Sequence, residues 1–154
     1  MSIQTWKFKT AWSWPKHIGE YFKEKVENPS LHVFSGMSPL GTVRIDLFMP
    51  ATIKADVRFL PIRDNLFQTV FGDPAWHTAK HLRSKIMYEL RRVTRIGGKI
   101  IINANWNPNN LKGCKLEQPI LYSRPRMPFG NTALIFTYTK YEDWPPQNKQ
   151  LVEG

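Results

Sequence analysis

Stretches of helical period alternate along this chain with short apolar runs. The first helical stretch opens near Pro15, carries apolar residues at near-helical spacing up to Val26, and is stopped by Asn28-Pro29. The second carries an apolar stripe over residues 82–93 at intervals of four, four and three, followed by Gly97-Gly98. This pattern predicts two amphipathic helices, the second ending at the glycine pair.

The apolar runs outside these helices are rich in β-branched and aromatic residues and predict strands. Their ranges are 31–34, 42–47, 66–72, 99–104, 118–122 and 132–139. Strands that alternate with helices and long connections indicate a parallel sheet, with the last pair as an antiparallel edge. We therefore predict an α/β fold, a Rossmann-like, doubly wound, mostly parallel sheet with an antiparallel edge strand.

The length of 154 residues predicts a single domain. We expect an aromatic-rich N-terminal arm over residues 1–14 and a polar, frayed tail over residues 144–154. No run approaches the roughly 20 apolar residues of a membrane span, and the first residues lack the apolar core of a signal peptide. The single cysteine, Cys114, excludes an internal disulfide framework. These features predict an intracellular, cytoplasmic protein without a membrane partner.

The net charge of +10 favours a polyanionic partner, with nucleic acid ahead of an acidic membrane surface. The second predicted helix concentrates this charge, and two arginines on a later loop add to it. The residues predicted to contact nucleic acid are Lys80, Arg83, Arg91, Arg92, Arg124 and Arg126. The alternatives are a solvated helix face and a charge that only confers solubility.

Asp73-Pro74-Ala75-Trp76 directly follows the predicted strand 66–72. Open α/β sheets bind their ligands at the carboxyl ends of parallel strands. Asp46 occupies a comparable place at the end of the second predicted strand, and Asp56 follows between that strand and residue 66. A lone aspartate at such a place is more often a turn former than a ligand, so the ordered set carries the functional hypothesis.

This order of segments resembles a small class I S-adenosylmethionine-dependent methyltransferase over roughly residues 30 to 140. The motif Asp73-Pro74-Ala75-Trp76 resembles the Asp-Pro-Pro-Trp signature of amino-group methyltransferases, with Ala75 in place of a proline. The compact form is also similar to small methyltransferase-like proteins of archaeal rod-shaped viruses. A viral relative would act in the host cytoplasm.

The resemblance implies S-adenosylmethionine as the cofactor and assigns roles to residues. Phe34-Ser35-Gly36 would form the first cofactor turn, where glycine lets the backbone come close. Asp46 would accept hydrogen bonds from the ribose hydroxyls, Asp56 would receive the adenine amino group, and Val57 would flank the adenine ring. At the catalytic end, Asp73 and the Pro74 carbonyl would accept the hydrogens of the target amine, with Trp76 stacked on the target base.

Two departures from the family pattern and one weak metal signal remain. The first turn offers only Gly36 and Gly41 and lacks the full glycine-rich pattern. Only a few residues separate Gly36 from Val43, where the family inserts a helix, and Pro39 disfavours a helix there. His77 and His81 have the spacing of two metal ligands, but no third ligand is evident, so we predict no metal site.

The sequence therefore predicts a methyltransferase for an amino group, first of all on a DNA or RNA base. One alternative is a non-catalytic nucleic-acid-binding protein on a degenerate methyltransferase scaffold. Another is a methyltransferase for a small molecule or a protein. The chain has no room for a separate recognition domain. Strong sequence specificity would therefore require a homodimer or a borrowed partner.

Overall fold

The computed structural model describes residues 16–73, 83–104, 109–123 and 132–146. The two helices of this part are α1 (Lys16–Lys25) and α3 (Arg83–Val93). The strands are β1 (Ser30–Val33), β2 (Val43–Asp46), β3 (Ile53–Lys54), β4 (Phe67–Gly72), β5 (Thr94–Ala104), β6 (Cys114–Leu116), β7 (Ile120–Ser123) and β8 (Thr132–Lys140). Neither helix is long and apolar enough to cross a membrane.

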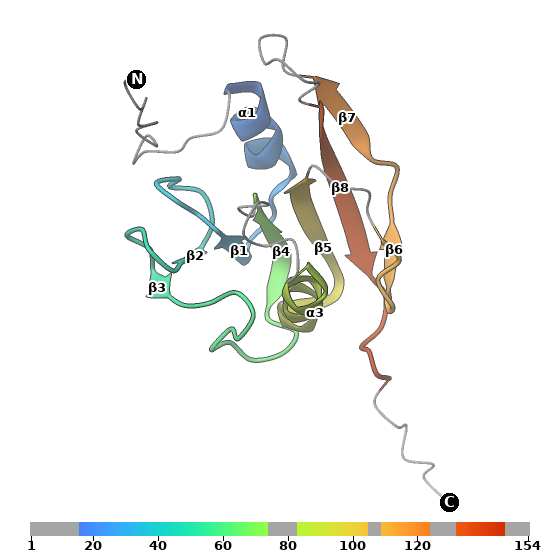
Figure 1. Ribbon diagram of the computed structural model, residues 1–154. Helices are drawn as coiled ribbons and strands as arrows, with labels where there is room; N and C mark the ends of the chain where they lie inside the picture. Colours follow the sequence, from blue (N-terminus) through green and yellow to red (C-terminus); the bar gives the residue numbers. More distant parts are fainter. Residues whose placement is uncertain (1–15, 74–82, 105–108, 124–131, 147–154) are drawn as a thin grey trace, which may run out of the picture.

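The strands form one mixed sheet in the order β3-β2-β1-β4-β5-β8-β6, with β7 also paired to β8 (Figure 1). Strands β1 to β5 are parallel to their neighbours, and β8 runs antiparallel to β5. β6 and β7 pair in succession with the far side of β8, so that they form one interrupted edge. The predicted α/β fold, mostly parallel with an antiparallel edge, is confirmed.

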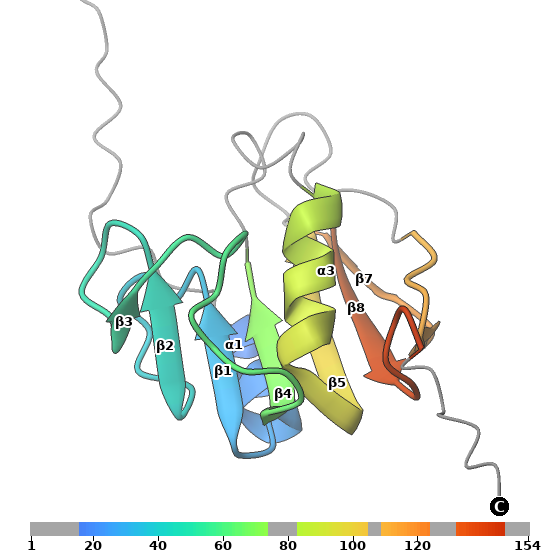
Figure 2. The same cartoon turned by 90° about the horizontal axis from the view of Figure 1, so that it is seen from below.

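The two helices cover opposite faces of the sheet, with α3 in front and α1 behind in Figure 2. The α3 face holds the larger core, in which Ile86, Leu90 and Val93 of the predicted helical stripe pack on the inner residues of the parallel strands. On the α1 face, Ile18 and Phe22 pack on Phe71 of β4. A helix on each face makes the sheet doubly wound.

The connection from β1 to β2 contains no helix, as the short spacing from Gly36 to Val43 predicts. It returns across the α1 face so closely that a Cβ on Gly41 would lie 2.9 Å from the Cβ of His32. The Nδ1 of His32 is 3.1 Å from the Leu40 carbonyl oxygen, and its ring stacks on Phe71 at 4.4 Å. A loop thus covers the part of the sheet where a helix is missing.

On the other face, the long loop from β3 to β4 is fastened to α3 by two side chains of the helix, Glu89 and Arg92, and Arg92 also pairs with Asp64 of the loop at 2.8 Å. Arg92 and Glu89 are paired at 2.7 Å. Glu89 accepts a hydrogen bond from the Leu60 amide, and Arg92 donates to the carbonyl oxygens of Leu60 and Ile62. These partners lower the pKa of Glu89, chiefly through the hydrogen bond from Arg92. The two side chains thus hold the loop against α3.

A buried lysine holds together the junction of α3, β5 and the end of β8. Lys140 is 1% exposed, and its ammonium donates to the Asn65 side chain at 2.7 Å and to the carbonyl oxygens of Arg91 and Thr94. It also pairs with Asp143 at 2.8 Å. The ammonium is therefore satisfied by four oxygen atoms, which makes its burial tolerable.

One prediction about the elements is wrong in detail. The helix ends at Val93 and not at Gly97-Gly98, because the chain enters β5 directly and the two glycines lie inside that strand. There, a Cβ on Gly98 would lie 2.8 Å from the Gln68 carbonyl oxygen. β3 and β6 were not predicted, since β3 has only two residues and the three residues of β6 follow a polar stretch. At the start of the expected tail, the Trp144 carbonyl accepts a hydrogen bond from Arg91, and residues 147–154 lie outside the described residues.

Candidate functional site

The strand register aligns two of the predicted acids at one edge of the sheet. His32 of β1 pairs with Arg44 of β2 on one side and with Phe71 of β4 on the other. Asp46 lies two residues after Arg44, and Asp73 lies two residues after Phe71. Residues two apart on a strand share a face, so both carboxylates lie on the α1 face at the carboxyl ends of β2 and β4. Two strand spacings put their backbones about 10 Å apart, with the end of β1 between them.

The end of β1 forms a tight turn between these acids. Phe34 and Gly36 both have positive φ, of 54° and 53°, so the chain leaves the strand at Phe34. Ser35 between them is 2% exposed and donates its amide to the Ile45 carbonyl. Its hydroxyl is buried, and no described residue hydrogen-bonds to it. A buried hydroxyl of this kind needs a partner, and a ligand in the turn would supply one.

Asp46 joins this turn to the end of β2. Its Oδ2 accepts a hydrogen bond of 3.0 Å from the Gly36 amide, and its Oδ1 accepts from the amides of Phe48 and Met49, both at 2.9 Å. A carboxylate has about four acceptor positions, so these bonds leave room for one further donor. The structure thus brings the turn after β1 into direct contact with the acid at the end of β2.

Asp56 lies beyond β3 and is engaged by a neighbour in the chain. Arg58 donates to both of its carboxylate oxygens, at 3.0 and 2.9 Å from Nε, and these hydrogen bonds lower the pKa of Asp56. Val57, predicted to flank an adenine ring, is 4% exposed and packs in the core on the α3 face. The structure therefore gives Val57 a packing role and leaves little of it accessible to a ligand.

Asp73 is positioned by its neighbours on both sides. Gly72 precedes it, and a Cβ there would lie 2.3 Å from the Val33 carbonyl oxygen, so only glycine lets β4 approach β1 this closely. On the other side, the Asn103 amide donates to Asp73 Oδ2 at 3.0 Å, and Asn103 is 3% exposed. Asn103 therefore orients the carboxylate at the edge of the sheet. Pro74 and Trp76 lie outside the described residues.

Several exposed apolar side chains lie in the loops that follow the first three strands. Phe48 is 83% exposed and Phe59 is 67% exposed, and Met37 and Leu47 are about half exposed. Leu47 and Phe48 directly follow β2, and none of the four was predicted as a site residue. The doublet Leu47-Phe48 after Asp46 was the available signal, because an apolar pair is unusual in a solvated turn. Asn103 also carried a signal, as the polar residue near the end of an apolar strand.

Of the six residues predicted to contact nucleic acid, the structure describes three, and two of these are engaged in contacts within the fold. Arg91 is 7% exposed and donates to the carbonyl oxygens of Lys112 and Trp144, while Arg92 holds the β3–β4 loop. Both guanidinium groups are thus used to stabilise the fold. Arg83 is partly exposed at the start of α3. The other predicted contacts, Lys80, Arg124 and Arg126, lie outside the described residues.

His32 is a buried titratable group that the sequence did not single out. Burial lowers its pKa to about 4, against a smaller opposing effect of the Leu40 carbonyl. The imidazole is therefore neutral at pH 7 and locks the β1–β2 loop in place. Burial likewise raises the pKa of the Cys114 thiol to about 11, which makes it unreactive. The described residues hold no cluster of three potential metal ligands, and His77 and His81 lie outside them.

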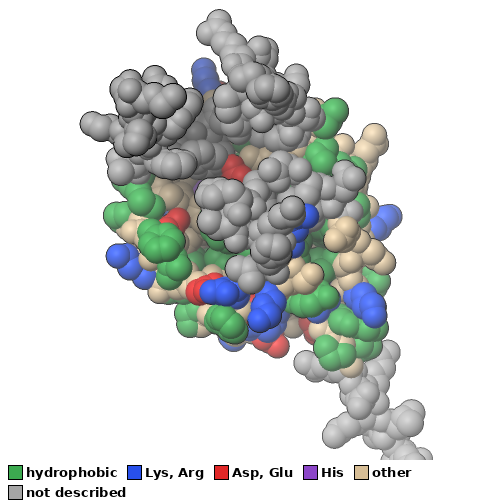
Figure 3. Space-filling view, in the orientation of Figure 1, with side chains coloured by type: hydrophobic (Ala, Val, Ile, Leu, Met, Phe, Trp, Pro, Cys, Tyr) green, Lys and Arg blue, Asp and Glu red, His purple; other side chains and the backbone are tan. Residues whose placement is uncertain are grey.

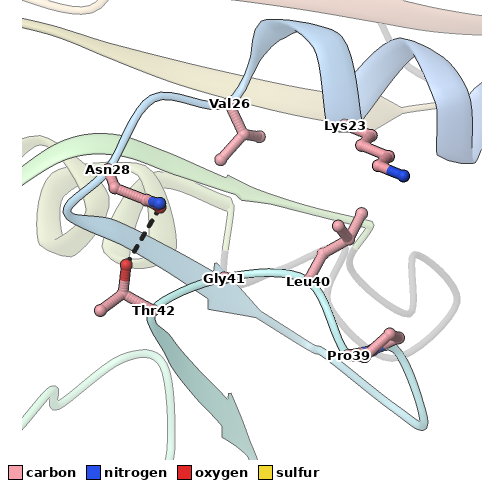
Figure 4. A pocket seen from close by; sticks show the side chains of 7 residues that line it. All are labelled: Lys23, Val26, Asn28, Pro39, Leu40, Gly41 and Thr42. Atoms are coloured by element: carbon pink, nitrogen blue, oxygen red, sulfur yellow. Dashed lines mark hydrogen bonds between the residues drawn. The ribbon is translucent and has the colours of Figure 1, made fainter.

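The absence of a β1–β2 helix leaves a pocket of about 440 Å³ between α1 and the loop before β2 (Figure 4). Asn28 and Thr42 line one end of it and are joined by a hydrogen bond of 3.1 Å. Both residues directly precede strands, so this pocket lies at the amino ends of β1 and β2. It is separate from the edge that carries Asp46 and Asp73.

No protein-family model matches the sequence, and no curated protein matches it either. Solved structures do share its fold. A candidate methyltransferase of Bacillus halodurans matches with a TM-score of 0.60 at 12% identity, over 82% of this chain and 99% of that one. A SAM-dependent methyltransferase of Methanosarcina mazei matches with a TM-score of 0.57 at 11% identity, over 86% and 100% of the two chains.

A third solved structure contains both ligands of its reaction. It is 1,6-didemethyltoxoflavin-N1-methyltransferase of Burkholderia thailandensis, with 1,6-didemethyltoxoflavin and S-adenosylhomocysteine bound. It matches with a TM-score of 0.58 at 11% identity, over 73% of this chain and 71% of that one. Identities this low show the fold alone, which is that of class I S-adenosylmethionine-dependent methyltransferases. The resemblances to Asp-Pro-Pro-Trp enzymes and to viral proteins stay predictions.

Proposed function

We propose that this protein is an S-adenosylmethionine-dependent methyltransferase that acts on an amino group of a DNA or RNA base. The observation that carries the proposal is the meeting of the β1 turn, Asp46 and Asp73 at one edge of a methyltransferase-fold sheet. Ligands of open α/β sheets bind at this edge, where the strand order reverses between β1 and β4.

The residues of this edge fit the cofactor. The buried Ser35 hydroxyl is a polar group in need of a partner, and the positive φ of Gly36 keeps the turn free of a side chain. Asp46 can accept one ribose hydroxyl without losing its three backbone hydrogen bonds. The exposed rings of Phe48 and Phe59 offer apolar contacts for an adenine, in place of the buried Val57.

Asp73 would act on the substrate amine. When bound, S-adenosylmethionine supplies an electrophilic methyl group on its sulfonium sulfur. Transfer to an amine depends on aiming the nitrogen lone pair, and fixing that geometry can supply several kcal/mol. The Asp73 carboxylate, oriented by Asn103, accepts hydrogens of the amine and stabilises the positive charge that develops on it. The Pro74 carbonyl and a stacked Trp76 complete this arrangement in the proposal.

A non-catalytic role in nucleic-acid binding is the second candidate. The short β1–β2 connection and the three backbone hydrogen bonds already made by Asp46 favour it, because both reduce the room for a cofactor. The polar, unpartnered Ser35 and the oriented Asp73 favour the enzyme, since neither arrangement is needed for binding a phosphate backbone.

Transfer of a radiolabelled methyl group from S-adenosylmethionine to mixed DNA and RNA tests the proposal. We expect labelled nucleic acid with the wild type and none with Asp73→Ala, while Asp73→Ala keeps its affinity for the cofactor. Glu20→Gln on the far side of α1 is the matched control and should retain full transfer. Loss of cofactor affinity with unchanged turnover in Asp73→Ala would overturn the assignment of Asp73.

A further inference from the structure

Exposed aromatic rings and cations gather at the edge of the molecule opposite to Asp46 and Asp73. Tyr88 on α3 is 54% exposed, and Trp144 after β8 is 40% exposed. Arg91 and Lys112 lie next to them, and we refer to these four residues as the aromatic–cation surface. In Figure 3, hydrophobic and basic side chains lie side by side at the lower right, near β6 and the end of β8.

Arg91 makes this surface continuous and rigid. Its guanidinium carbon lies 5.1 Å from the centre of the Tyr88 ring. The same guanidinium donates to the Lys112 carbonyl at 2.9 Å and to the Trp144 carbonyl at 3.2 Å. Two segments far apart in sequence are thus fixed to α3 through one buried side chain. Rings held in this way bind a ligand with little loss of conformational entropy.

The charge on this surface is positive. The Lys112 ammonium lies 4.7 Å from the centre of the Trp144 ring, and Lys85 is exposed one helical turn before Tyr88. The acids of the nearby segment are Glu142 and Asp143. Asp143 is paired with Lys140, which lowers its pKa and neutralises its charge. Exposed rings next to free cations are the combination that binds stacked bases and phosphates.

We propose that the aromatic–cation surface binds single-stranded nucleic acid, with bases stacked on Tyr88 and Trp144 and phosphates near Lys112 and Lys85. This inference rests on the proposed function and deepens it by naming single-stranded nucleic acid as the substrate class. Bases in a duplex already stack on one another and cannot offer their faces to these rings. The net charge of +10 favours a polyanion over an apolar protein surface.

Helix α3 links this surface to the proposed catalytic edge. It begins at Arg83, near the carboxyl end of β4, and runs back along the sheet to Arg91 (Figure 2). Its 11 residues span about 16 Å. At about 3.4 Å for each stacked nucleotide, roughly five nucleotides cover this distance. A strand held on Tyr88 and Trp144 can therefore follow α3 to the edge of the sheet at which β4 ends.

Fluorescence anisotropy with a labelled single strand of about 12 nucleotides and mixed sequence tests the inference without any cofactor. The probes are single-stranded DNA, single-stranded RNA and the matching duplex. We expect Tyr88→Ala and Trp144→Ala each to weaken single-strand binding about tenfold, whereas Tyr88→Phe and Trp144→Phe retain it. Lys112→Ala should weaken binding and reduce its salt dependence, while Lys16→Ala, the same loss of charge on the other face, should not.

The inference is overturned if the wild type binds no single strand at low salt, or if it prefers the duplex with an affinity that Tyr88→Ala leaves unchanged. Equal losses in Lys112→Ala and Lys16→Ala would also overturn it, because binding would then follow total charge alone. Thermal unfolding of each variant shows that the fold is retained. A separate titration with S-adenosylmethionine distinguishes this failure from failure of the methyltransferase proposal, since neither measurement depends on the other.

Discussion

Replacing Gly72 by alanine tests how tightly the candidate site is built into the sheet. The added Cβ would lie 2.3 Å from the Val33 carbonyl oxygen and 2.7 Å from Val33 Cγ2. An ordinary contact between carbon and oxygen is about 3.3 Å or longer, so β1 and β4 must separate by about 1 Å. Val33 and Gly72 are direct partners in the sheet, so the strain falls on the ladder itself.

Overpacking of this kind costs about 1–3 kcal/mol, and the upper half of the range applies because the obstacle is backbone. For a chain of this length, a loss of about 2 kcal/mol lowers the Tm by about 4–8 °C. The β1 turn and Asp73 directly follow the two clashing residues. Gly72→Ala should therefore also weaken the binding of S-adenosylmethionine, which calorimetry measures.

Gly19→Ala is the matched control, because nothing lies within 4 Å of a Cβ at Gly19 in helix α1. The same chemical change there should raise the free energy of unfolding by about 0.5–1 kcal/mol, since alanine favours the helix. Urea unfolding at 25 °C compares both variants with the wild type. If Gly72→Ala is as stable as Gly19→Ala, the result would contradict the close approach of β1 and β4 at Gly72.

Three further predictions concern buried polar groups and the proposed catalytic edge. Lys140→Met should lower the free energy of unfolding by about 3–5 kcal/mol, because two buried carbonyl oxygens lose their donor and Asp143 loses its counterion while keeping its hydrogen bonds from Asn65. A loss below about 1 kcal/mol in urea unfolding would contradict the network. The pKa of His32 is about 4 in the folded state and 6.5 in the unfolded state, so the unfolded state binds more protons between these values. The free energy of unfolding of the wild type should therefore fall by up to about 3 kcal/mol as the pH is lowered from 6.5 to 4. His32→Phe should flatten this part of the stability profile, and an equally steep profile in both proteins would refute the assignment. Asn103→Ala should reduce kcat while leaving the KM for the cofactor nearly unchanged, as expected of a residue that orients Asp73, and a change confined to KM would show another role.

The sequence predicted the layered α/β fold because strand and helix patterns alternate clearly along the chain. It also predicted the short β1–β2 connection, since Pro39 and the few residues between Gly36 and Val43 leave no space for a helix. The proximity of Gly36 and Asp46 followed from the fold, because both lie at the carboxyl ends of adjacent parallel strands.

The hydrogen-bond and ion-pair partners of the side chains could not be predicted from the sequence. Arg91 and Arg92 resemble solvent-exposed charges in a basic helix, and only the packed structure shows that backbone carbonyls far along the chain satisfy them. The buried Lys140 has partners from four different segments, which no local pattern reveals. Val57 was placed at the adenine because it follows Asp56, yet packing against the core on the α3 face decides its orientation.

Calorimetric titration of the purified protein with S-adenosylmethionine tests the central proposal most directly. We expect micromolar binding that Asp46→Ala weakens at least tenfold, because the variant loses the carboxylate that joins the β1 turn to the end of β2. Glu20→Gln should bind as the wild type does. Absence of binding at millimolar cofactor would contradict the methyltransferase proposal, leave the fold unaffected, and favour the non-catalytic nucleic-acid-binding protein.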